Sequence, residues 1–320
     1  MNAAPDIPRA GSAYIGRFAP SPTGPLHLGS LVAALGSWLD ARAAGGRWLV
    51  RMEDLDRPRC VPGAADTILR QLESYGLNWD GAVLAQSRRD AAYAAALEQL
   101  RESGAVYRCV CTRSQLSEVR RNAQGETIYP GTCRDNATDE HTPHAWRVLA
   151  PEDVIGFTDR VWREITQSVA ADVGDFVVQR ADNLFAYQLA VVVDDAYQHI
   201  SDVVRGADLL WNTPRQIALQ TLLGVPTPRY AHLPLVTNAL GQKLSKQTLA
   251  PALPERARSR VLSDALNVLG HAPPTPLRDA PPTELLAWAV AHWRINAVPS
   301  HSAIAKSEPA SDNPPNPLPP

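Results

Sequence analysis

The stretch Arg17-Phe-Ala-Pro-Ser-Pro-Thr-Gly-Pro-Leu-His-Leu-Gly-Ser30 decides the fold, because it leads from an apolar strand through a proline- and glycine-rich loop into an apolar helix. We expect the strand at residues 13–18 and the helix at residues 30–44. A second strand follows at residues 47–52 and ends in an acidic run that begins with Glu53. Strand, helix and strand in this order make a βαβ unit, so the chain is predicted to be an α/β protein with a parallel sheet.

The loop in this stretch is suited to an anion. Gly29 lets a ligand approach the backbone closely, and the helix start offers unpaired N–H groups and the positive end of its dipole. His27 adds a hydrogen-bond donor at the same place. The arrangement suits ATP but differs from the Walker P-loop, G-x-x-x-x-G-K-[ST]. Judged alone, it also fits an ordinary strand–helix turn whose histidine is satisfied within the protein.

Length and composition narrow the class of protein. The chain has 320 residues, of which 45% are hydrophobic, and this is enough for a sizeable core. A formal net charge of −2 excludes a generic binder of polyanions. No apolar run approaches the ~20 residues of a membrane helix, and residues 1–12 lack the apolar stretch of a secretory signal. We therefore expect a cytoplasmic protein whose four cysteines are reduced thiols or metal ligands.

Lysine is rare in this chain. Of 31 basic residues only Lys243, Lys246 and Lys306 are lysines. A coding bias towards arginine explains the ratio, yet it makes each remaining lysine informative, since an ammonium and a guanidinium are not interchangeable. Lys243-Leu-Ser-Lys246-Gln247 holds two of them, where their ammonium groups could contact a triphosphate. The alternative interpretation is a solvated surface loop.

The remainder of the chain divides by composition. We expect helices at residues 63–75, 89–103, 213–223, 253–269 and 282–293, and strands at residues 176–179 and 189–193. Residues 108–175 are polar, hold three cysteines and are predicted to be an insertion between the two halves of the sheet domain, 13–107 and 176–226. The other predicted parts are an extension at 1–12, the lysine loop with a short helical segment at 227–295, and a disordered Pro-rich tail at 296–320.

The two motifs together resemble the HIGH and KMSKS signatures of class I aminoacyl-tRNA synthetases, here His27-Leu-Gly-Ser30 and Lys243-Leu-Ser-Lys246-Gln247. The preceding Arg17-Phe-Ala-Pro-Ser-Pro-Thr-Gly24 is similar to the glutamyl-tRNA synthetase branch. The resemblance covers about residues 14–250 and departs from the signatures at Ser30 and Gln247, two positions that vary within the branch. It implies a Rossmann-type parallel sheet with an insertion.

The resemblance also implies a site for L-glutamate, which has two carboxylates and one ammonium. Arg17 can grip a carboxylate bidentately, Ser21 can donate from its hydroxyl, and Glu53 can pair with the ammonium. By similarity, Tyr187 and Arg205 contact the substrate, although each also has a structural interpretation as a core ring or an ion-pair partner. The residues implied for glutamate are Arg17, Phe18, Ala19, Pro20, Ser21, Glu53, Tyr187 and Arg205.

A two-step reaction follows from the same resemblance. A substrate carboxylate attacks the α-phosphate of ATP, pyrophosphate leaves, and an acceptor hydroxyl then attacks the glutamyl-adenylate. Catalysis is expected from positioning and charge stabilisation by His27 and Lys246, with Mg²⁺ accompanying ATP. The residues implied for ATP are His27, Gly29, Lys243 and Lys246.

Three cysteines in the insertion suggest one structural zinc ion. Zinc prefers four tetrahedral ligands, and Cys109, Cys111 and Cys133 supply three. Chemistry alone nominates His141 or His144 as the fourth, whereas the resemblance implies Tyr129, through the pattern Cys-x-Cys…Tyr-x₃-Cys. We follow the resemblance and expect Tyr129, against the alternative of three buried thiols.

The chain is short for a complete glutamyl-tRNA synthetase. Only 73 residues follow Gln247, which is too few for an anticodon-binding region. This length resembles the truncated paralogues that transfer glutamate to queuosine in the anticodon of tRNA(Asp), after activation without tRNA. We expect ATP, L-glutamate and that anticodon stem-loop as partners, and a monomer. The alternatives are a conventional enzyme that charges tRNA(Glu) and a catalytically silent tRNA-binding paralogue.

Overall fold

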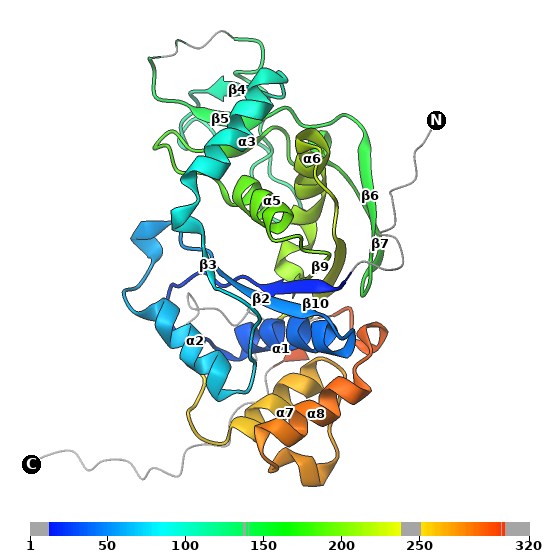
Figure 1. The fold of residues 1–320 in the computed structure, drawn as a ribbon. Coiled ribbons are helices and arrows are strands. Elements are labelled where there is room, and N and C mark those ends of the chain that lie inside the picture. Colours follow the sequence, from blue (N-terminus) through cyan, green and yellow to red (C-terminus); the bar gives the residue numbers. More distant parts are fainter. Residues whose placement is uncertain (1–12, 137–138, 140, 238–250, 302, 305–320) are drawn as a thin grey trace, which may run out of the picture.

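The computed structural model describes residues 13–136, 139, 141–237, 251–301 and 303–304. It is an α/β fold in three tiers, with an antiparallel sheet at one end, a parallel sheet in the middle and two helices at the other end (Figure 1). None of the helices in these residues combines the length and apolar character that crossing a bilayer requires.

The parallel sheet begins with the predicted βαβ unit. Its strands β1 and β2 pair in parallel, from Ile15 opposite Arg47 to Phe18 opposite Val50, and β3 adds to the outer edge of β2. The helix starts two residues earlier than predicted because His27 caps it. The elements are β1 (Ile15–Phe18), α1 (Leu28–Ala43), β2 (Arg47–Met52) and β3 (Leu84–Ala85).

A second sheet of four strands lies on the other side of β1. Ser201 connects them, because its N–H donates to the carbonyl of Ile15 over 3.0 Å and its hydroxyl accepts from the N–H of Ile15 over 2.9 Å. Strands β9 and β10 are parallel, and β10 also meets β6 in parallel, opposite Asp159. These strands are β6 (Val154–Asp159), β7 (Arg163–Ser168), β9 (Asp202–Gly206) and β10 (Arg229–Leu233).

Helices cover both faces of the parallel sheet. Figure 1 shows α5 and α6 on one side and α1 on the other. Leu31, Leu35 and Leu39 of α1 are completely buried, since α1 lies between the sheet and the C-terminal helices. The predicted helices near 63–75, 89–103 and 213–223 are confirmed. The helices are α2 (Ala64–Ser74), α3 (Asp90–Glu102), α5 (Tyr187–Tyr197) and α6 (Thr213–Leu223), with short 3₁₀ turns at Arg57–Arg59, Gln86–Arg88 and Ala207–Asn212.

The insertion builds a sheet of its own. The predicted strand at residues 176–179 exists, but it pairs antiparallel with β5 and so belongs to this sheet and not to the parallel one. The insertion also contains β6 and β7, whose hairpin borders β10. The elements of this tier are β4 (Val106–Cys109), β5 (Ala145–Val148), α4 (Val169–Asp172) and β8 (Phe176–Gln179).

The prediction of a strand at residues 189–193 is wrong. These residues lie inside α5, with Leu189, Ala190, Val191 and Val192 all buried. A short apolar run that is buried on every side has no periodicity to separate a strand from a helix. The β-branched composition of this run therefore predicts a strand where the protein forms a helix.

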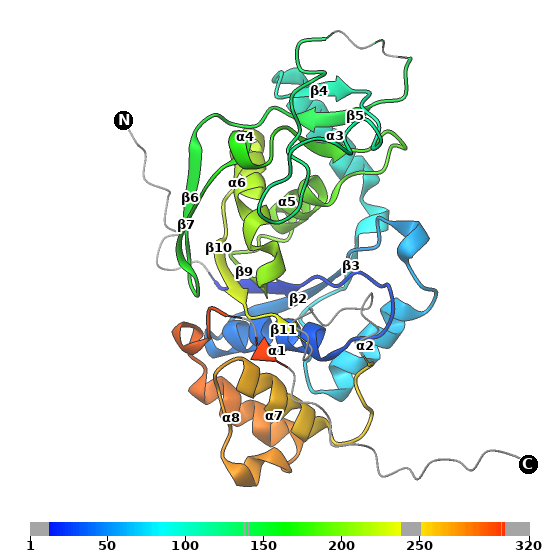
Figure 2. The ribbon, with the colours of Figure 1, turned by 180° about the vertical axis from the view of Figure 1, so that it is seen from behind.

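The C-terminal helices pack against α1 (Figure 2). Trp293 donates from Nε1 to Asp40 of α1 over 2.9 Å. The predicted disorder from residue 296 is wrong for the described residues, because Val298 is buried and residues 303–304 pair in parallel with residues 236–237. Residues 305–320 lie outside the described part. The elements are β11 (Val236–Thr237), α7 (Arg258–Val268), α8 (Pro282–His292) and β12 (Ala303–Ile304), with 3₁₀ turns at Thr275–Arg278 and Ile295–Ala297.

Candidate active site

Four parallel strands carry a basic side chain or a histidine at their second-to-last residue. These are Arg17 in β1, Arg51 in β2, Arg205 in β9 and His232 in β10, and we call them the strand-end row. Their exposed fractions are 3%, 0%, 5% and 0%. Carboxyl ends of parallel strands meet at one edge of the sheet, which is where ligands bind in such folds. Buried charges need partners, so the surroundings of this row define the candidate site.

Asp195 holds the first two members of the row together. Its carboxylate accepts from Nε and Nη2 of Arg17, at 3.1 and 3.2 Å, and from Nη1 of Arg51 at 2.8 Å. Burial raises the pKa of Asp195, but the two guanidinium groups outweigh it and the net pKa lies below its ordinary value. Glu53 accepts from Arg51 over 3.3 Å, yet burial dominates there and raises its pKa. The predicted bidentate grip of Arg17 is thus directed at Asp195 within the protein.

Tyr187 lies close to these charges. Burial raises the pKa of its phenol, and the charges of Arg205, Glu53 and Arg17 all act on it. The predicted residues come from four elements, β1, the end of β2, the start of α5 and β9, and the charges of Arg17, Glu53 and Arg205 all reach the phenol of Tyr187. A group with donors and a carboxylate acceptor side by side can bind a substrate that carries both carboxylate and ammonium.

Arg205 is held on several sides. It donates from Nε to Nε2 of His232 over 3.0 Å, from Nη1 to Gln216 over 2.8 Å and from Nη2 to Thr213 over 2.8 Å. Its guanidinium carbon also lies 5.5 Å from the ring centroid of Tyr230. Each Nη carries two N–H groups, so Nη1 retains a donor for a ligand.

The loop after β1 joins the site to α1. His27 is the N-cap of α1, and its Nδ1 accepts from the N–H of Ser30 over 3.3 Å, while the Ser30 hydroxyl accepts from the N–H of His27 over 2.8 Å. The departure from the HIGH signature at Ser30 thus completes a capping box. Because Nδ1 accepts, the proton of the neutral ring lies on Nε2.

The other predicted loop residues differ in their surroundings. Phe18 is buried and stacks with Trp48 at 6.2 Å, so its side chain belongs to the core. Pro20 accepts from the N–H of Glu53 over 3.0 Å, which ties the loop to the end of β2, and Ser21 is exposed. Lys243 and Lys246 lie outside the described residues.

The insertion gathers three thiols around one phenol. The sulfur atoms of Cys109, Cys111 and Cys133 lie within 4.8 Å of one another. The hydroxyl of Tyr129 lies 3.3 Å from the first sulfur and 3.6 Å from the second, and it accepts from the N–H of Cys133 over 3.0 Å. We call these four residues the cysteine cluster. Thiolates at this spacing fit a tetrahedral zinc ion, so the residues present are suited to the predicted metal.

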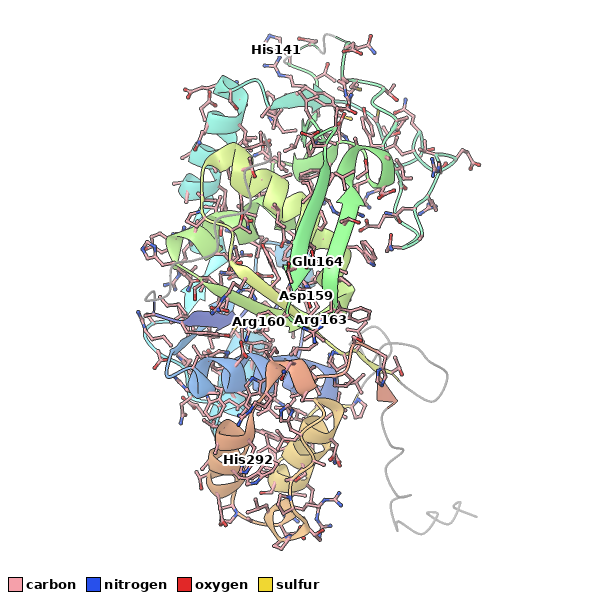
Figure 3. The ribbon with its side chains drawn as sticks, turned by 90° about the vertical axis from the view of Figure 1, so that its right-hand side faces the viewer. His141, Asp159, Arg160, Arg163, Glu164 and His292 are labelled. Atoms are coloured by element: carbon pink, nitrogen blue, oxygen red, sulfur yellow. The ribbon has the colours of Figure 1, made fainter. Side chains whose placement is uncertain are left out.

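Two thiols of the cysteine cluster have pKa values shifted in opposite directions, and burial raises the pKa of Cys111. Burial raises the pKa of Cys133, but hydrogen bonds from the backbone at Val110 and from Tyr129 outweigh it and lower the net pKa. The two histidines considered for the fourth position lie apart: Nδ1 of His144 is 2.7 Å from the carbonyl of Thr142, and His141 is labelled at the far end of the insertion (Figure 3). Among the described residues, the group of metal-ligand atoms contains no histidine.

Sequence reasoning missed the residues that organise the row. Arg51, Asp195, His232 and Asp159 are all buried, and none lies in a recognisable motif. A signal existed for two of them: Arg51 interrupts an otherwise apolar run before Met52, and Asp195 follows an apolar run in α5. A buried charge in an apolar element is retained where it has a partner, and here the partner is across the site.

A family model and two solved structures are similar to this chain. The family model for the catalytic domain of class I tRNA synthetases (E and Q) matches residues 15–257. A glutamate-tRNA synthetase from Elizabethkingia anophelis has a TM-score of 0.78 at 25% identity, over 93% of this chain and 69% of that one. A methionyl-tRNA synthetase from Mycobacterium tuberculosis, with a TM-score of 0.51 at 14% identity, shares the fold alone.

Relatives in sequence cover nearly the whole chain. A protein of Thiobacillus denitrificans named glutamyl-Q tRNA(Asp) synthetase is 66% identical over 298 residues, which are 93% of this chain and 99% of that relative. One of the same name from Chromobacterium violaceum is 54% identical, over 90% and 96% of the two chains. With this identity over almost the full length of both relatives, the chain belongs to the glutamyl-Q tRNA(Asp) synthetase family of the class I tRNA synthetases.

Proposed function

We propose that this protein activates L-glutamate with ATP to glutamyl-adenylate without tRNA, and then transfers the glutamyl group to queuosine in the anticodon of tRNA(Asp). The observation that carries the first step is the strand-end row beside Glu53, which gathers carboxylate-binding donors and one ammonium-binding acceptor at the carboxyl edge of the sheet. The name shared by the relatives supports the acceptor.

In this proposal, the substrate is held by charge and by hydrogen bonds. Glu53 pairs with the α-ammonium, while Arg17 and Arg205 hold carboxylates through nitrogens that the protein leaves available. The phenol of Tyr187, the hydroxyl of Ser21 and the backbone of residues 18–20 complete the contacts. Glutamine is excluded because its amide N–H groups would face arginine donors and leave them unpaired.

ATP binds at the start of α1 in the same proposal. His27 and the backbone at Gly29 contact the phosphates, and Lys243 and Lys246 neutralise charge as pyrophosphate leaves. Mg²⁺ supplies further charge neutralisation on the phosphates when it is bound with ATP. Lys246→Arg should lower adenylate formation by about tenfold or more, because a point charge is replaced by a bulkier fork, whereas Lys306→Arg should change nothing.

We propose one structural zinc ion for the cysteine cluster, with Cys109, Cys111, Cys133 and Tyr129 as ligands. The distances between the sulfur atoms and the phenol support this set. The ion would hold together a segment with few apolar side chains and takes no part in the chemical step.

Glutamate-dependent ATP–pyrophosphate exchange in the absence of tRNA tests the first step, and exchange is expected. Labelled glutamate is then offered to tRNA(Asp) with and without queuosine, and only the queuosine form should be labelled. Labelling of tRNA(Glu), or exchange that requires tRNA, would assign the protein to the conventional synthetases. Absence of both activities would assign it to silent tRNA-binding paralogues.

We also propose that the protein works as a monomer in the cytoplasm. Light scattering coupled to size exclusion should then give a mass near 34.7 kDa at the concentrations used in the exchange assay. A mass twice as large would refute the monomer.

A further inference from the structure

His232 lies between a charged donor and a charged acceptor. Arg205 donates to its Nε2 over 3.0 Å, and its Nδ1 lies 2.6 Å from Oδ2 of Asp159. Because a guanidinium carries donors alone, Nε2 has to accept, and the proton of the neutral ring lies on Nδ1. The three side chains form a line of hydrogen bonds from Asp159 through His232 to Arg205, across β6, β10 and β9.

Backbone groups anchor the acidic end of this line. Oδ1 of Asp159 accepts from the N–H groups of Val161 and Trp162, each over 2.9 Å, in the turn between β6 and β7. Figure 3 shows Asp159 at this turn, near the level of the central sheet. Burial raises the pKa of Asp159, but its bonds to His232 and to the backbone outweigh it and lower the net pKa. The carboxylate is therefore charged and fixed in direction.

The opposite side of Arg205 is also fixed. Its Nη1 donates to Gln216, and the amide of Gln216 donates to Gln188 over 2.9 Å. Gln188 follows Tyr187 in α5, so the guanidinium is connected to the helix that carries another predicted substrate contact. With a histidine on one side and a glutamine on the other, the plane of the guanidinium is determined before a ligand arrives.

We infer that His232, oriented by Asp159, is a positioning residue that aims the guanidinium of Arg205 at a carboxylate of glutamate. The inference rests on the proposed function, which assigns Arg205 to the substrate. Fixing a long side chain in advance removes the ordering cost from the binding step, so the benefit falls on glutamate and not on ATP.

The role requires a neutral ring, because a protonated ring would point an N–H group at the donors of Arg205. Burial lowers the pKa of His232 to about 4, with the charge of Arg205 in the same direction, although Asp159 opposes both. Nε2 is therefore an acceptor throughout the neutral range of pH.

Two substitutions separate the two sides of the ring. His232→Asn retains a donor near the position of Nδ1 but has no atom near Nε2, whereas His232→Gln extends an acceptor to the position of Nε2. In glutamate-dependent ATP–pyrophosphate exchange, the KM for glutamate should rise about tenfold or more in His232→Asn and clearly less in His232→Gln. The KM for ATP should stay within about twofold in both.

The outcomes separate this inference from the proposed function. An unchanged KM for glutamate in folded His232→Asn would overturn the inference. Equal rises in the KM for glutamate and the KM for ATP would also overturn it, since a merely structural histidine affects the whole site. Wild-type protein without exchange would instead refute the proposed function. Thermal unfolding of each variant, followed by circular dichroism, verifies that it is folded.

A measurement on the wild-type protein keeps the test independent of the variants. In ¹⁵N NMR of histidine-labelled protein, His232 should carry its proton on Nδ1, and its Nε2 signal should shift when glutamate is added. A proton on Nε2 would contradict the inference, and so would an Nε2 chemical shift that stays the same at saturating glutamate. Both results can be obtained even if both variants fail to fold.

Discussion

The cysteine cluster and the strand-end row differ in how far apart their members lie along the chain. All four residues of the cysteine cluster come from residues 109–133. The row and its counter-charges Asp195 and Asp159 join five strands and a helix, and Arg51 and Asp195 alone are separated by 144 residues. One cluster can form within a single segment, whereas the other exists only after the whole parallel sheet has assembled.

The two regions also differ in what neutralises them. The cysteine cluster has thiols and a phenol that favour a cation supplied from outside, while Arg17 and Arg51 of the row are neutralised by the protein's own Asp195. The first should therefore respond to metal and the second to charge.

The largest effect is expected from Asp195→Asn. The variant leaves Arg17 and Arg51 buried without their shared carboxylate, so the free energy of unfolding should fall by about 3–5 kcal/mol and glutamate-dependent exchange should nearly disappear. Urea unfolding and the exchange assay measure the two effects. Asp182→Asn is the matched control, because its ion pair with Arg180 is exposed and should contribute less than about 1 kcal/mol.

The next effect is loss of metal in Cys111→Ser. Zinc content should fall from about one ion per chain to almost none, because the variant removes one of the three thiolates, which are the ligands that zinc prefers. Glutamate-dependent exchange without tRNA should persist, since the row shares no residue with the cluster. Cys60→Ser, which changes a cysteine outside the cluster, should retain its zinc. Unchanged zinc content in Cys111→Ser would refute the site, and simultaneous loss of exchange would refute the independence of the two regions.

A smaller effect is expected from pH, which should change the free energy of unfolding of the protein through His232 of the row. The pKa of His232 is about 4 in the folded protein, below its ordinary value of 6.5, so the unfolded chain binds more protons between these values. The contribution of His232 to the free energy of unfolding should therefore be fully present above pH 6.5, and the free energy of unfolding should fall by about 2 kcal/mol on going to pH 5. Urea unfolding at pH 7.5 and pH 5 measures it. His232→Gln should lose this part of the dependence, and equal slopes in the two proteins would contradict the assignment.

The smallest effect is expected from Tyr129→Phe. It removes one hydroxyl from the cysteine cluster and leaves the ring that packs against Arg147, so zinc affinity should fall by at least about tenfold without unfolding. Competition with a chromogenic chelator measures the affinity. His144→Ala is the control and should bind zinc like the wild type. The reverse result would make His144 the fourth ligand.

The sequence predicts local features of this protein well. The strand at residues 47–52 and the helix at residues 213–223 match the structure at both ends, and the βαβ unit and the cysteine cluster are present as expected. Each depends on a pattern within one segment. The resemblance to the glutamate branch is likewise confirmed, because its motifs are contiguous in the chain.

Features that depend on the assembled fold could not be predicted. The apolar run at 189–193 is helical because tertiary burial surrounds it, and residues 176–179 join the insertion because their partner strand lies there. The partners of Arg17 and Arg205 could not be predicted for the same reason. Asp195 and His232 contact these arginines only when α5 and β10 lie beside β1 and β9.

The second-to-last position on each strand has a consequence for redesign. The backbone at this position is fixed by strand pairing and not by loop conformation, so the side chains there start from a rigid part of the sheet. The loops that follow could then change length or sequence while the row keeps its spacing. An altered substrate charge would be accommodated by exchanging residues within four known positions, each together with its buried partner, and the architecture around them would need no revision.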